Sequence, residues 1–360
     1  MNPHAFPSPL VSVLPNMPDS TASRPCGNLF KMKDGDTCTA TWDKMRDVLH
    51  PAQAAVGFAA VKRKHDKAYK TPEKAQRRMD EPGSFLPFVL GPHGVPYLVD
   101  SHHTISALEA SGHHSSVQVH LKKICDWSYL TPNDFYVAMK KENFMNGTDR
   151  ISSRDSTIGQ SMKKDDMNKL PIQVDVAKAI PETVAGLKDD PWRSLAALVR
   201  KVKDGDKCPP DNSECLRGYL RECREDGSMT PFFEFRWAYF FNDAYNHGCT
   251  SKETSYWDDL SDCQRFHDAY SALMKTNVGF PILQQDKKAW QKAAKLLVPL
   301  CRGKKAQTYI LPIGLGRPMG GEKLPGRVAG KDTQIKVKDP SCEAPKCPSL
   351  PRPSTLKPVR

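Results

Sequence analysis

The segment PHGVPYLVDSHHTISALEASG, residues 92–112, predicts a strand, a turn and a helix with polar side chains at the junction. A short apolar run ends at Asp100, and a helical pattern begins at Thr104 and ends on Gly112, a residue favoured just after helices. A serine and two histidines, residues 101–103, stand between them. Polar residues at a strand-to-helix switch are candidates for ligand binding, because ligands approach the backbone there.

The chemistry expected at this junction is that of phosphate. A helix N-terminus presents unpaired N–H groups and a partial positive charge, and both favour an anion. His102 and His103 can donate hydrogen bonds to phosphate oxygens, move a proton near neutral pH or bind a metal. Ser101 or Thr104 can cap the helix and offer a hydroxyl, while Asp100 can orient an imidazole, bind a metal or accept a proton. We therefore expect phosphoester or phosphoryl chemistry.

The surroundings of the junction predict a small α+β unit. Two apolar runs, residues 85–90 and 95–100, are joined by Gly-Pro-His-Gly and predict a β-hairpin. The proline in each run places these strands at sheet edges or at strand starts. Residues 116–121 alternate apolar and polar side chains, which indicates a half-buried strand. Most of the chain after residue 130 has helical patterns, and the aromatic run 231–245 predicts a buried core helix rather than a cofactor site.

Composition divides the chain into four predicted regions: a flexible leader (1–37), a core (38–130), a helical extension packed on the core (131–301) and a basic disordered tail (302–360). The formal charge of +12 belongs mostly to the tail, which has thirteen Lys and Arg against four Asp and Glu. A tail of this kind can hold nucleic acid or an acidic partner by charge, or simply keep the chain in solution.

The eleven cysteines are an odd number without a close Cys-x-x-Cys pair, so neither a zinc ribbon nor a thioredoxin motif is indicated. Cys208, Cys215 and Cys223 are expected to be ordinary thiols, with a loop disulfide or loose metal contacts left open. No apolar run reaches the ~20 residues of a membrane span. The first residues lack the basic region of a secretory signal, which favours a location inside the cell. The oligomeric state is not indicated.

A resemblance to a known family supports the junction as a site. YLVDSHHTISAL, residues 97–108, resembles the strand-turn-helix box of the ParB/sulfiredoxin superfamily, in particular the Asp-x-His-His box of its ParB-like nuclease branch. Residues 50–64, 189–200 and 232–241 resemble further segments of that branch in the expected order. The resemblance implies a ParB/sulfiredoxin-like mixed-sheet core that cradles the phosphates of a nucleotide.

The resemblance also implies particular site residues, and this chain differs from the family pattern at two positions. It implies Asp100, His102 and His103 as catalytic or phosphate-site residues. The upstream segment adds Gln53, Gly57 and Lys62 as lining, with Lys62 or Lys64 as charge partner for phosphate; a solvated basic helix face is the alternative. Thr104 stands where many relatives have Arg, so their bidentate phosphate clamp is missing. Ser101 replaces the sulfiredoxin cysteine, which argues against sulfinate repair.

We expect a ParB-like nuclease or nucleotide hydrolase. In this mechanism the amides of Thr104 and Ile105 hold the phosphate, His103 contacts an oxygen, and His102 with Asp100 handles the proton or a divalent metal. A divalent metal (Mg²⁺ or Mn²⁺) and a nucleotide are the expected cofactors, and a nucleotide or nucleic acid is the expected partner. The alternatives are a small-molecule kinase with Asp100 as base and a non-catalytic nucleotide or nucleic-acid binding module.

Overall fold

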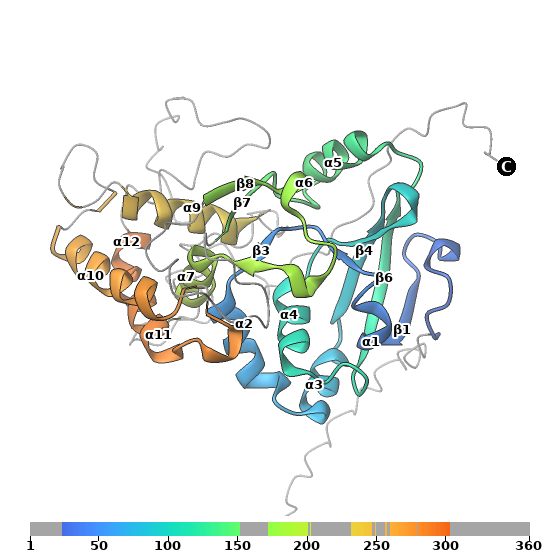
Figure 1. Ribbon diagram of the computed structural model, residues 1–360, viewed down its shortest axis with the longest axis horizontal. Coiled ribbons are helices and arrows are strands. Elements are labelled where there is room, and N and C mark those ends of the chain that lie inside the picture. Colours follow the sequence, from blue (N-terminus) through green and yellow to red (C-terminus); the bar gives the residue numbers. More distant parts are fainter. Residues whose placement is uncertain are drawn as a thin grey trace, which may run out of the picture.

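The computed structural model describes residues 24–151, 172–200, 202, 232–246, 249, 256–257, 260–278 and 280–302. In Figure 1 the mixed sheet and the helices packed on it lie on one side of the molecule, and a cluster of further helices lies on the other side. Helix α2 and strand β3 lie between the two parts. The α+β class and the mixed-sheet core expected from the sequence are confirmed. None of the helices in the described ranges combines the length and apolar character needed to cross a bilayer.

The main sheet has five strands in the order β1-β6-β4-β5-β2. Their bounds are β1 Thr37–Thr41, β2 His50–Pro51, β4 Phe85–Leu90, β5 Pro96–Leu98 and β6 Gln118–Asp126. β1 and β6 are antiparallel, as are β4 and β5, whereas β4 runs parallel to β6 and β2 runs parallel to β5. Two small sheets join β3 (Ala55–Val56) to β9 (Lys188–Asp189) and β7 (Thr148–Ile151) to β8 (Ile172–Asp175).

The predicted hairpin is confirmed as β4 and β5, but the expected place of β4 is wrong. Pro87 lies inside β4, and β4 is an interior strand between β6 and β5. The missing N–H of Pro87 is tolerated beside an irregularity, because the β4–β6 register shifts between Phe88 and Val89. The Pro87 carbonyl still accepts a hydrogen bond from Val99 at 3.0 Å. β5 does begin at its proline, Pro96, as expected.

Helices begin where the sequence places capping residues. Thr71, Thr131 and Asp190 each accept a backbone N–H at an N-terminus whose first turn contains proline. The α-helices are α1 Trp42–Met45, α2 Phe58–Lys64, α3 Pro72–Met79, α4 His102–Ser111, α5 Pro132–Lys141, α6 Val176–Ala179, α7 Pro191–Val199, α9 Phe233–Asn246, α10 Leu260–Thr276, α11 Lys287–Leu296 and α12 Val298–Arg302. The 3₁₀ helices are η1 Leu29–Lys31, η3 Pro92–Gly94, η5 Val184–Gly186 and η6 Ile282–Gln284, and η2 His65–Tyr69 is a π-helix that continues α2.

Two large apolar clusters fill the interior. One packs the sheet against α2, α3 and α4. The other is aromatic and joins α7, α9, α10 and α11, with Trp192 stacked on Tyr270 at 4.3 Å between ring centroids. α9 is buried as expected, because Trp237 and Phe240 on it are at most 1% exposed. Ala59 of α2 belongs to this second cluster, so the short helix α2 connects the sheet side to the helical side.

The first described residues correct the expected leader. Residues 24–37 were expected to be flexible, yet a disulfide joins Cys26 to Cys38 of β1. Backbone hydrogen bonds of 2.8 Å (Cys26 N to Thr39 O) and 2.9 Å (Thr39 N to Arg24 O) add this segment to the sheet edge. Residues 1–23, the predicted tail from 303 on, and Cys208, Cys215 and Cys223 lie outside the described residues. The other domain boundaries stay predictions.

The Cys26–Cys38 bond should stabilise the sheet edge, because it closes a loop with a sequence separation of 12 residues. Replacing both cysteines, Cys26→Ser with Cys38→Ser, should lower the free energy of unfolding by roughly 3 kcal/mol. Denaturant unfolding of the oxidised chain and of the variant measures the difference. Equal stability of the two would show that this cross-link does not constrain the unfolded chain.

Candidate functional site

Helix α4 begins at His102, two residues earlier than expected, so both histidines lie in its first turn. Its N-cap, Ser101, has φ 68° and ψ 15°, a left-handed conformation that non-glycine residues rarely adopt and that is often found at functional sites. The Ser101 hydroxyl makes no capping hydrogen bond. The Asp100 carboxylate instead accepts the Ser101 N–H at 2.6 Å. The start of α4 is therefore not closed by its own N-cap side chain.

The backbone amides at this N-terminus differ from those expected. The N–H groups of Thr104 and Ile105 donate to the Ser101 carbonyl at 2.9 and 3.0 Å. They are not available to a phosphate, and the prediction that they hold it is wrong. The N–H groups of His102 and His103 have no acceptor within the helix, because no helical carbonyl lies one turn before them. Ile105 is fully buried in the apolar core.

His102 acts as a clamp between backbone segments. Its Nε2 lies 3.1 Å from the Ala52 N–H, which also donates to the Leu98 carbonyl at 3.0 Å. Burial lowers the pKa of His102 well below its usual value, and the charge of Arg193 acts in the same direction, although a hydrogen bond to the Leu98 carbonyl opposes them. The ring is 6% exposed and is bonded to backbone groups of β5 and the segment after β2. This geometry supports a structural role rather than the expected handling of a proton or metal.

His103 faces two elements that are distant in sequence. Its Nε2 lies 3.3 Å from the Gly57 N–H and 3.5 Å from Glu234 Oε1 of α9. Burial lowers the pKa of His103 well below its usual value, and the charges of Arg193 and Lys64 add to this effect. The ring is therefore neutral near pH 7, with Nε2 as the acceptor. No partner for Nδ1 lies among the described residues, so its N–H remains a donor for a ligand oxygen.

Lys64, not Lys62, is the lysine that reaches the junction. Lys64 Nζ donates to Thr104 Oγ1 at 2.8 Å, whereas Lys62 Nζ is paired with Asp66 at 2.6 Å. Burial and the nearby charge of Arg78 lower the pKa of Lys64 to about 8, although the carboxylate of Asp100 opposes them. Of the two lysines expected as the charge partner, Lys64 therefore reaches the junction, whereas Lys62, two positions earlier, is paired with Asp66.

The remaining predicted residues take different places. Gln53 is buried, and its Nε2 has no partner among the described residues. Gly57 lets two helices approach closely, because a Cβ there would lie 2.5 Å from the Ser194 backbone nitrogen. Asp100 is exposed, yet the surrounding protein raises the pKa of its carboxyl group.

Two charged residues that sequence analysis missed complete the junction. Arg193 of α7 is 3% exposed and donates to the Ala55 carbonyl at 2.5 Å and to Glu234 at 3.2 Å. Glu234 thereby connects the buried arginine to His103. Both residues occur in the segments 189–200 and 232–241, which resemble the family. The available signal was a charged residue within a run of apolar, buried positions.

Buried carboxylates hold the backbone behind this cluster. Asp149 Oδ2 accepts the N–H groups of Ala54 and Ala55 at 2.7 and 3.3 Å, and Asp190 caps α7. Burial raises the pKa of Asp149, and it raises the pKa of Asp190 to about 8 against the opposing charge of Arg193. Asp149 therefore fixes the segment between β2 and α2, and Asp190 fixes the start of α7.

The junction is a better fit for a phosphate than for a divalent metal. Among the described residues, no three His, Cys, Asp or Glu side chains lie within reach of one another at this junction. The positive charge of Lys64 also acts near Asp100 and Glu234. A nucleotide or nucleic-acid phosphate at the first turn of α4 stays a prediction.

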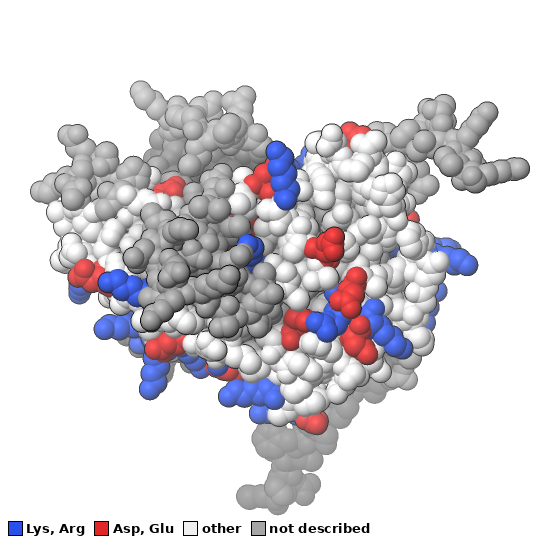
Figure 2. Space-filling model, in the orientation of Figure 1, with Lys and Arg blue, Asp and Glu red and all other residues white. Residues whose placement is uncertain are grey.

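The surface around the described part carries both signs of charge. Figure 2 shows basic and acidic side chains interleaved on this face, without one continuous basic stripe over the coloured residues. An open hollow on α3 contains none of the predicted site residues; it is lined by Pro72, Glu73, Gln76, Arg77, Asp80 and Ser116.

Replacing His102 should lower the free energy of unfolding, and because the ring is neutral no charge is removed. His102→Leu fills a similar volume but loses the ring's hydrogen bonds to backbone groups at Ala52 and Leu98. We expect the free energy of unfolding to fall by about 1–3 kcal/mol. His113→Leu, beyond the end of α4, is the matched control and should change it by less than ~0.5 kcal/mol. Denaturant unfolding distinguishes the two, and an unchanged His102→Leu variant would contradict the clamp.

Comparisons with known proteins agree with this core. A family model described as "Putative ParB-like nuclease" matches residues 45–211. A solved structure, the crystal structure of protein Atu1540 from Agrobacterium tumefaciens, is 23% identical, with 66% of this chain and 90% of that chain covered and a TM-score of 0.37. No functional conclusion follows from that similarity. The comparison with curated proteins gave no match.

Proposed function

Because residues 45–211 belong to the ParB-like nuclease family, we propose that this chain hydrolyses phosphoesters of a nucleic acid or nucleotide at the start of α4. The observation that carries the proposal is the 2.8 Å contact of Lys64 Nζ with Thr104 Oγ1. It sets a cation beside the open first turn of a helix, where the N–H groups of His102 and His103 already favour an anion.

Lys64 also supplies the positive charge that the family's arginine would provide at the position of Thr104. Relatives with Arg at this position would supply a positive charge from α4 itself. Here the charge comes from α2 and is hydrogen-bonded to the threonine that replaces the arginine. An ammonium group is a compact phosphate partner but lacks the planar fork of a guanidinium. The proposed site therefore binds phosphate by one cation and by backbone amides rather than by a bidentate clamp.

The side chains around the phosphate suggest a division of tasks. The His103 Nδ1–H donates to a non-bridging oxygen. The exposed Asp100 carboxylate accepts a proton from water, whose oxygen then attacks phosphorus. Lys64, with a pKa of about 8, gives a proton to the leaving oxygen as the P–O bond breaks. The Gly57 N–H holds the His103 ring through Nε2, and Arg193 binds Glu234, whose Oε1 lies 3.5 Å from the same nitrogen.

Variants at the junction test the proposal. His103→Ala, Asp100→Asn and Lys64→Met should each lower the rate of cleavage of a fluorogenic oligonucleotide by about 100-fold or more, because each removes a proton-transfer group or a charge at the reacting phosphate. His113→Ala is the matched histidine control and should leave the rate unchanged. Equal rates for His103→Ala and His113→Ala would place the reaction elsewhere.

The same assay separates the alternatives. Turnover of a nucleoside triphosphate that requires an added hydroxyl acceptor would indicate a kinase. Ligand-dependent stabilisation without turnover would indicate a binding module. Either result would overturn the hydrolase proposal while keeping the phosphate site.

The pH dependence of the rate provides an independent check on Lys64. A general acid must be protonated, so the rate should fall as the pH rises through about 8. In Lys64→Arg the side chain stays charged, and this fall should disappear even though the maximal rate drops. A wild-type rate that does not decrease between pH 7 and pH 9 would exclude Lys64 as the acid.

A further inference from the structure

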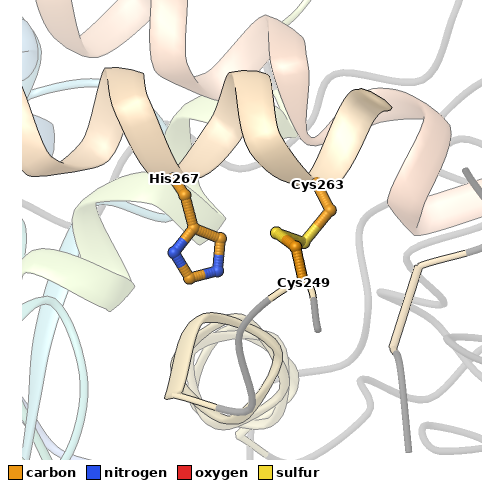
Figure 3. A group of neighbouring side chains, drawn as sticks. All are labelled: Cys249, Cys263 and His267. Carbon is orange, nitrogen blue, oxygen red and sulfur yellow. A yellow bond between two sulfur atoms is a disulfide. The ribbon is translucent and has the colours of Figure 1, made fainter. Parts of the chain in front are cut away.

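A second cluster of reactive side chains lies in the helical part, away from the sheet. Figure 3 shows Cys249, Cys263 and His267 close together, with the last two on α10. Cys263 and His267 are four positions apart, so a helix places them on the same face. One ligand atom from each residue can be chosen so that all three lie within 4.8 Å of one another. Cys249 and Cys263 are joined as a disulfide.

The surroundings of the His267 ring leave its Nε2 as an acceptor. Its Nε2 is buried and has no hydrogen-bond partner in the described part of the chain, and Figure 3 shows this nitrogen on the side of the two sulfurs. The hydrogen bond between the ring and the Ala244 carbonyl must therefore come from Nδ1–H. This fixes the tautomer with a lone pair on Nε2. A backbone carbonyl on the other nitrogen is typical of metal-binding histidines.

The ring is also held in one orientation. Tyr245 of α9 stacks on His267 with centroids 4.5 Å apart and planes 13° apart. A structural disulfide has no need of a buried imidazole lone pair beside it. The Cys26–Cys38 bond of the sheet edge illustrates this, since no histidine forms such a group with it in the described part of the chain. The unpaired lone pair at His267 is therefore a feature that the disulfide alone does not explain.

We propose that Cys249, Cys263 and His267 form a redox-gated zinc site. A dithiol reductant transfers two electrons and two protons to the disulfide, is itself oxidised to a disulfide, and leaves two cysteine thiols. Zn²⁺ then binds two thiolates and His267 Nε2 and displaces both thiol protons to solvent. A water completes the tetrahedron, as in sites with three protein ligands.

The burial of the two cysteines suits this exchange. Cys249 is half-buried and is therefore the more exposed of the two, while Cys263 is buried in the aromatic cluster. The site would cross-link residue 249 to α10 in either state, by a covalent bond when oxidised and by zinc when reduced. This inference is independent of the phosphate chemistry proposed at α4.

Zinc binding by the full chain tests the proposal. The reduced, metal-free chain should bind one more Zn²⁺ per chain than the Cys249→Ser/Cys263→Ser variant, measured by elemental analysis after gel filtration. The difference is the readout because every other cysteine is reduced as well. Co²⁺ in place of zinc should give thiolate charge-transfer bands and tetrahedral d–d bands that the variant lacks. The oxidised chain should lack the extra metal.

Further variants distinguish a ligand from a structural residue. His267→Ala should weaken zinc binding by at least ~10-fold, whereas Cys26→Ser/Cys38→Ser should leave it unchanged. If the reduced chain loses structure, recovery of its circular dichroism on addition of zinc supports the site, and no recovery overturns it. Equal zinc binding by the reduced chain and by the Cys249→Ser/Cys263→Ser variant would also overturn it, and the disulfide would then be structural only.

Discussion

Two histidine rings at the start of α4 hold the backbone of residues 52–57, and the rest of the molecule depends on that contact. His102 accepts a hydrogen bond from Ala52, and His103 accepts one from Gly57. The held segment runs from β2 in the main sheet through β3 into α2. β3 pairs with β9, which leads into α7 of the helical part. The imidazoles therefore join the two halves of the fold, and they do so only while neutral.

This constraint also explains why the charged groups converge. Once residues 52–57 lie against α4, helix α2 directs Lys64 to Thr104, and the close approach at Gly57 brings α7 with Arg193. Arg193 in turn binds Glu234 of α9. Five elements thus contribute to one small region around the first turn of α4. The open N-terminus and the left-handed Ser101 lie where these elements meet, which is why we place the phosphate there rather than on the wider surface.

Local features of this arrangement could be predicted from the sequence, and long-range ones could not. The hairpin, the alternating strand and the capped helices each follow from neighbouring residues, and Asp100 to His103 were identified from one switch in pattern. The amides that a ligand could reach are those of His102 and His103, two residues before the predicted pair. This shift was not predicted, because Ser101 adopts a left-handed conformation that serine does not favour. Arg193 bonds a carbonyl 138 positions away, a distance that no local pattern encodes. The Cys26–Cys38 bond was missed because its Pro, Ser and Gly surroundings are typical of flexible segments.

The disulfides have a consequence for any sample of this protein. Such bonds persist in oxidising surroundings and are rare in a reducing cytosol. Material from a reducing expression host would carry free thiols at Cys26 and Cys38 and at Cys249 and Cys263, whereas secreted material would carry the cross-links. Two batches with the same sequence would then differ in mass by two hydrogens for each disulfide, and they would differ in their sheet edge and in the attachment of residue 249 to α10. The redox conditions under which a sample was produced therefore determine which cross-links it contains.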